Sequence, residues 1–172
     1  MLRRATGVIA ALCFLTIVGT GAAQAAPPAH VGPFTESYSF IGMSCDGFDV
    51  LIEGTLTTRF TVFFDNEGEV DRVVEHVAAP YDVLTNTVTG ESIVVRAHFT
   101  HIDERVAGTD TFTRAITGFR YLVTRPGEGI VLRDVGRIEY ATPEQVEVTF
   151  SAGFHDLAFD ADIEPAFCAL LS

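Results

Sequence analysis

The chain has 172 residues, 48% of them hydrophobic, and a formal net charge of −12. A surface of this charge repels the phosphates of nucleic acids and of anionic membranes, so the composition excludes both as partners.

The first 25 residues show the three parts of a secretory signal peptide. Arg3 and Arg4 form the basic start, residues 8–18 (VIAALCFLTIV) are apolar, and Ala23-Gln24-Ala25 is a small-x-small cleavage site. The apolar run is shorter than the roughly 20 residues that span a membrane. Cleavage after Ala25 leaves 147 residues with a net charge of −14, because both leader arginines are lost. We therefore expect a secreted protein, extracellular or in the cell envelope, without membrane attachment after cleavage.

After cleavage, we expect a flexible Pro-rich lead over residues 26–33 and a single domain over residues 34–172. Apolar side chains alternate with polar ones along the domain, and a period of two is typical of half-buried strands. Phe48, Val50 and Ile52 form one such series. The clearest runs are 48–54, 59–65, 91–101, 118–124 and 145–151.

Turn-forming residues separate these runs. Asp65–Gly68 predicts a hairpin turn with glycine at positive φ, and Thr89–Gly90, Pro126–Gly129 and Thr142–Pro143 predict further turns. Helical spacing is confined to residues 163–171, where a short C-terminal helix or turn is expected.

The alternation with one polar face predicts antiparallel pairing and an all-β fold of about 8–10 strands. A single antiparallel β-barrel is favoured because closure removes exposed strand edges. A two-sheet β-sandwich is the alternative.

Two cysteines remain after signal cleavage, Cys45 and Cys168. An even pair in an exported chain predicts one disulfide, which would connect the C-terminal tail to the start of the sheet. A nucleophilic Cys45 would need a nearby base, and no local signature supplies one. The two cysteines also lack the paired spacing of zinc sites. No catalytic residue, metal site or cofactor is predicted.

Basic side chains within the strand patterns are weak candidates for ligand binding. His98 and His101 are three residues apart, so on a strand they point to opposite faces, and His101 is expected on the apolar side with Phe99. The candidate ligand-binding residues are Arg72, His76, His101 and His155. Asp160 and Asp162 resemble part of a calcium loop but lack its glycine and spacing, so a solvated acidic loop is favoured.

Several segments together resemble uncharacterised secreted proteins of actinobacteria. They are CDGFDV (45–50), TVFFDNEGEV (61–70), LTNTVTGES (84–92), GIVLRDVGRIEY (129–140), SAGFHD (151–156) and FCALL (167–171). The resemblance covers most of the mature chain. It implies export and a β fold, and it carries no functional residue or activity.

Fold class, export and charge together favour a non-enzymatic binding or interaction module, whose partner is a small molecule or another protein. Thirteen phenylalanines remain after cleavage, enough to line a cavity or to fill a core. The alternative is a barrel-type enzyme, a cyclase, isomerase or hydrolase using scattered His, Asp or Glu residues. That alternative predicts a cleft where some of Arg72, His76, His101 and His155 meet. The oligomeric state is left open.

Overall fold

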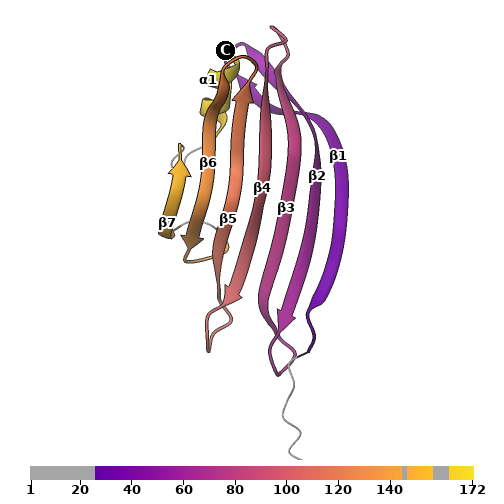
Figure 1. Ribbon diagram of the computed structural model, residues 1–172, viewed down its shortest axis with the longest axis vertical. Helices are drawn as coiled ribbons and strands as arrows, with labels where there is room; N and C mark the ends of the chain where they lie inside the picture. Colours follow the sequence, from indigo (N-terminus) through magenta and orange to yellow (C-terminus); the bar gives the residue numbers. More distant parts are fainter. Residues whose placement is uncertain (1–25, 145–146, 157–162) are drawn as a thin grey trace, which may run out of the picture.

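The computed structural model describes residues 26–144, 147–156 and 163–172, and these form one antiparallel sheet and one helix (Figure 1). The strands lie in the sheet in the order of the sequence, so each pairs with its chain neighbours. They are β1 (Ala29–Cys45), β2 (Phe48–Phe64), β3 (Val70–Asn86), β4 (Ser92–Arg105), β5 (Phe112–Arg125), β6 (Gly129–Tyr140) and β7 (Val148–His155). The helix α1 spans Glu164–Leu171.

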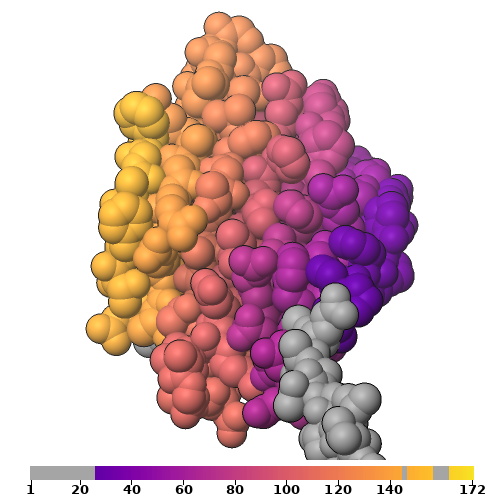
Figure 2. All heavy atoms as spheres, turned by 60° about the horizontal axis from the view of Figure 1, so that its bottom comes forward, coloured from indigo at the N-terminus to yellow at the C-terminus, as the bar shows by residue number. Residues whose placement is uncertain are grey.

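The all-β class, the antiparallel pairing and the C-terminal helix are confirmed. The described residues form seven strands instead of 8–10, because separate apolar runs belong to one long strand: residues 48–54 and 59–65 both contribute to β2. The sheet is not closed into a barrel, and it is not split into two sheets. Strands β1 and β7 lie on opposite sides of the molecule (Figure 2). Among the described residues, β1 and β7 do not pair with each other, so both edges of the sheet stay open.

The N-terminal region differs in part from expectation. Residues 29–33, expected to belong to a flexible lead, are the first residues of β1, because His30 and Val31 pair with Thr61 and Phe60 of β2. Residues 1–25, predicted to be a signal peptide, lie outside the described residues.

The predicted turns connect consecutive strands. Asp65–Gly68 joins β2 to β3, Thr89–Gly90 joins β3 to β4, and Pro126–Gly129 overlaps the turn between β5 and β6. Gly68 has a φ of 89°, a conformation that favours glycine, as the turn prediction required. The Asp65 carboxylate accepts hydrogen bonds from the backbone N–H groups of Glu67 and Glu69. These contacts hold the pKa of Asp65 below its ordinary value.

A row of three glycines crosses one side of the sheet. Gly118 of β5 pairs with Gly136 of β6, which pairs with Gly153 of β7. All three have positive φ values, and a Cβ at any of them would overlap the backbone of a neighbouring strand. Glycine rows of this kind let a sheet bend sharply. The row thus allows β5, β6 and β7 to bend together.

Helix α1 covers one end of one sheet face, which we call the inner face (Figure 1). Phe167 and Leu171 of α1 are buried against apolar side chains from five strands. Those side chains are Val50, Leu84, Ile93, Val95, Val123 and Leu132. The main core is therefore the space between α1 and this end of the sheet.

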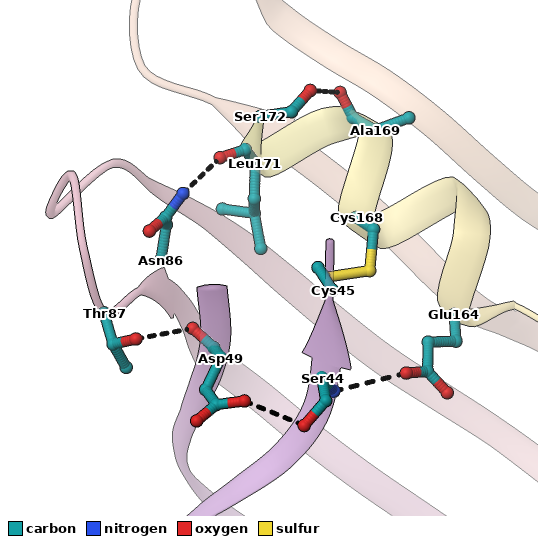
Figure 3. The surroundings of a disulfide bond; sticks show 10 residues. All are labelled: Ser44, Cys45, Asp49, Asn86, Thr87, Glu164, Cys168, Ala169, Leu171 and Ser172. Atoms are coloured by element: carbon teal, nitrogen blue, oxygen red, sulfur yellow. Dashed lines mark hydrogen bonds between the residues drawn. A yellow bond between two sulfur atoms is a disulfide. The ribbon is translucent and has the colours of Figure 1, made fainter. Parts of the chain in front are cut away.

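The predicted disulfide between Cys45 and Cys168 is present and joins the end of β1 to α1 (Figure 3). The two Cα atoms are 5.6 Å apart, although 123 positions separate them in the sequence. Buried Asn86 at the end of β3 also holds the helix, because its side-chain amide donates to the Leu171 carbonyl at 2.9 Å. The helix is thus attached covalently near its middle and by a hydrogen bond at its C-terminus.

Candidate functional site

Below α1, the inner face contains a groove of about 410 Å³, which we call the inner groove. This volume is within the range of about 300–1,000 Å³ typical of small-ligand sites. Strands β1 to β5 all contribute to it. Its lining residues are Tyr38, Leu56, Val77, Ala79, Asp82, Ala97, Phe99, His101, Ile116, Arg120 and Tyr121.

The floor of the inner groove is apolar. Val77, Ala79 and Ile116 are buried, and Val77 pairs directly with Phe99 of β4. Ala79 pairs with Ala97, so two adjacent strands present only methyl groups at this rung. Because these alanine side chains are small, they leave room for the groove. The apolar floor can contact the apolar part of a ligand.

Asp82 brings a carboxylate into this apolar setting. A bulge between Ala79 and Asp82 shifts the register of β3 against β4, and bulges commonly re-aim side chains. Asp82 Oδ1 is buried and has no hydrogen-bond partner within the described part of the chain. A Cβ at Gly54 would overlap this carboxylate, so the glycine of β2 makes room for it. An unsatisfied buried oxygen is costly, so the site favours an incoming donor.

The Tyr38 hydroxyl of β1 lies close to the Asp82 carboxylate, and both approach Gly54 of β2. Burial, reinforced by the neighbouring Asp82 carboxylate, raises the pKa of Tyr38 well above its ordinary value. Burial likewise raises the pKa of Tyr121 across the groove. Both phenols therefore remain protonated at neutral pH and present O–H groups as well as aromatic surface.

Arg120 lies where the groove meets a buried polar network. Its Nε donates to Asp134 Oδ2 at 2.7 Å, and its Nη1 donates to the Tyr140 hydroxyl at 3.2 Å. The other Asp134 oxygen is 2.5 Å from His155 Nδ1. Burial lowers the pKa of Arg120, but the charge and hydrogen bond of Asp134 outweigh it and raise the pKa overall. The guanidinium is therefore a permanent cation with its carboxylate already in place.

His101 forms the lower end of the groove. Its Nδ1 lies 2.9 Å from Glu75 Oε2 on the neighbouring strand, and its ring centroid lies 4.9 Å from that of Phe99. His98, by contrast, is exposed and contacts Phe119 on the other face. The predicted split of the two histidines between the faces is thus confirmed.

The four candidate ligand-binding residues do not meet in one cleft. His101 and His155 lie on the inner face, each beside a different carboxylate. Arg72 and His76 lie on the opposite, outer face: Arg72 packs over the Phe63 ring at 4.1 Å, and His76 Nδ1 contacts Thr100 Oγ1 at 3.0 Å. Only His101 lines the inner groove. The arrangement that the enzyme alternative requires is not formed by these four residues.

Burial, together with the charges of Arg59 and His98, lowers the pKa of His76 below its ordinary value. His76 is therefore neutral at neutral pH.

Four polar residues of the groove were not identified from sequence: Tyr38, Asp82, Arg120 and Tyr121. One signal was present for Asp82, because Pro80 interrupts a strand pattern two residues earlier, and proline within a strand marks an edge or a bulge. Tyr121 lies in the run 118–124 that was expected to form a strand, but its neighbour Arg120 joins the same face at the bulge of β5 against β4. Alternation alone places Arg120 on the opposite face.

In the described ranges, no group of three or more His, Cys, Asp or Glu side chains is arranged to hold a metal ion. The calcium-like residues Asp160 and Asp162 lie outside those ranges. No described helix is long and apolar enough to cross a membrane.

Comparison with known proteins finds no matching family model, no similar curated protein and no similar solved structure.

Proposed function

We propose that this chain is an exported binding protein that holds a small, mainly apolar molecule in the inner groove. The observation that carries the proposal is the buried Asp82 oxygen, unsatisfied beside an apolar floor. A concave apolar site with a few converging polar groups is the usual form of a small-ligand site. The Cys45–Cys168 disulfide and the signal-peptide pattern support export.

The polar groups indicate which ligand fits. Asp82 accepts hydrogen bonds and forms no ion pair among the described residues, whereas Arg120 and His101 each have a carboxylate within hydrogen-bond distance. The groove thus keeps a net acceptor character. A neutral or cationic molecule with an N–H or O–H donor satisfies Asp82, while its apolar body covers Phe99 and Ile116. An anionic ligand is disfavoured.

A fluorescent probe of this chemistry tests the proposal. N-Phenyl-1-naphthylamine is neutral, apolar and carries one N–H donor, and its emission rises when it leaves water. The chain has no tryptophan, so protein emission does not interfere with the titration. We expect saturable binding by the disulfide-bonded protein. Asp82→Asn should weaken it about tenfold, because a hydrogen bond to a charged group contributes about 1.5–3 kcal/mol.

Two further variants complete the test. Ala97→Phe fills the groove and should abolish binding, whereas Asp110→Asn makes the same chemical change as Asp82→Asn at an exposed residue of the β4–β5 turn and should leave binding unchanged. Circular dichroism verifies that each variant is folded. Equal probe binding by the wild type, Asp82→Asn and Ala97→Phe would place the probe elsewhere and refute the proposal.

A further inference from the structure

Strand β1 is a long open edge of the sheet. Its 17 residues pair with β2 on one side, and none of the described residues forms a strand on its other side. A strand edge of this kind presents a row of unpaired N–H and C=O groups that can pair with another chain. Natural proteins usually protect such edges with charges, prolines or bulges.

The protection of β1 is confined to its two ends. Register shifts occur between Val31 and Phe34, where Pro33 lies, and between Ile41 and Met43. The regular stretch between them, residues 34–41, contains a single formal charge, Glu36, in a chain of net charge −12. Phe34 and Phe40 of this stretch are 57% and 51% exposed. An unprotected, nearly uncharged, aromatic edge therefore lies on a strongly acidic protein.

We propose that β1 pairs antiparallel with β1 of a second copy of this chain, about a two-fold axis at Ser37. In this register, Phe34 lies opposite Phe40 of the partner subunit, and Glu36 lies opposite Tyr38 of the partner subunit. Both pairs occur twice because of the symmetry. Directly opposite aromatic pairs stabilise antiparallel sheets, and Glu36 lies opposite an uncharged aromatic side chain in place of a second carboxylate.

The neighbouring registers are less favourable. Moving the axis to Glu36 brings two carboxylates directly opposite each other, which is destabilising. Moving it to Tyr38 places Glu36 opposite a phenylalanine. A shift by one residue would require side chains on opposite faces to pair. Ser37 is therefore the axis that the sequence of the edge favours.

The opposite edge of the sheet is a weaker partner. β7 has eight residues, fewer than half of the 17 in β1. Pairing of β1 with β7 of another copy would also be heterologous, so it would leave free edges and continue into a fibre instead of a closed dimer. The β1–β1 pair closes after two copies.

The pairing has a consequence for the inner groove. The two-fold axis of an antiparallel pair is perpendicular to the sheet, so both inner faces lie on the same side of the combined sheet. Tyr38 lines the groove and lies in the paired stretch of β1. The dimer therefore carries two grooves, each bordered by the shared edge.

Sedimentation velocity over the micromolar range tests the proposal with the disulfide-bonded protein. We expect a dimer, and we expect Phe34→Glu to raise its dissociation constant at least about tenfold, since it removes both aromatic pairs and adds charge beside Glu36. Phe150→Glu makes a comparable change on β7, where the phenylalanine is also exposed, and should leave the dimer intact. Circular dichroism identifies any variant that fails to fold.

Cysteine crosslinking tests the register without disturbing the aromatic residues. Opposite residues of an antiparallel pair have Cα atoms about 4.5–5.5 Å apart, within disulfide range. Ser37→Cys should therefore form a covalent dimer on oxidation, whereas Thr35→Cys, two positions from the axis, should not. A wild-type protein that is monomeric throughout the micromolar range would overturn the proposal. A dimer lost in Phe150→Glu but kept in Phe34→Glu, or crosslinked equally by both cysteines, would do so too.

Discussion

Replacing Asp134 with asparagine tests how much burial increases the contribution of an ion pair to the free energy of unfolding. The Asp134 side chain is 3% exposed and lies between the Arg120 guanidinium at 2.7 Å and the His155 ring at 2.5 Å. The amide keeps the shape of the carboxylate but removes its charge, so the buried Arg120 cation loses its counterion. Removing one partner of a buried ion pair lowers the free energy of unfolding by about 3–5 kcal/mol. For Asp134→Asn we expect a loss near the lower value, because Tyr140 still contacts Arg120.

Asp103 provides the matched control. It binds Arg114 through two hydrogen bonds of 2.6 Å, so its geometry is at least as good, but its side chain is 20% exposed. Water can solvate the Arg114 charge that remains after the substitution. Asp103→Asn should therefore lower the free energy of unfolding by only about 1 kcal/mol. Urea unfolding of both variants gives the two free energies by linear extrapolation, with unchanged m-values as the check on two-state behaviour. Equal losses would refute the argument that burial, and not contact geometry, sets the contribution.

Replacing Cys45 and Cys168 together with serine should lower the free energy of unfolding by up to about 5 kcal/mol, the loop-entropy value for 123 residues, measured by urea unfolding. Because the pKa of His76 is lowered in the folded state, the unfolded chain binds the extra proton. Stability should therefore fall as pH drops below about 6.5, less steeply in His76→Gln. In an alkaline absorbance titration, Tyr38→Phe and Tyr121→Phe should each remove a late-ionising phenol.

The features that could be predicted from the sequence depend on local rules. Alternation along residues 48–54 placed Val50 and Ile52 on the core face, and both pack in the main core. Gly68 and Gly90 marked turns because few other residues adopt positive φ. The pairing of Cys45 with Cys168 followed from counting the thiols that remain after the predicted signal cleavage. None of these inferences required knowledge of which strands are neighbours across the sheet.

The inner groove depends on such neighbours and could not be predicted. Asp82 and Arg120 enter the groove through bulges in β3 and β5, and each bulge reverses the face expected from alternation. Gly118, Gly136 and Gly153 were separate glycines in the sequence, and only the pairing of three strands aligns them. The strands are also longer than the short apolar runs in the sequence indicated, so the number of strands was overestimated. Pro80 was the local signal for one bulge.

The size of α1 explains why the inner face carries two kinds of chemistry. Eight helical residues extend about 12 Å, whereas a 17-residue strand extends about 56 Å. One short helix can therefore shield only one end of the inner face, and the apolar side chains of Val50, Ile93 and Leu132 are confined to that end. Beyond the helix, the inner face carries a second, smaller buried cluster of Ile116, Ile138 and Tyr140, together with ion pairs such as Asp103–Arg114. Between these regions lies the inner groove, where apolar floor and unsatisfied carboxylate coexist. That combination is costly in an empty site and favourable once a ligand with a donor occupies it.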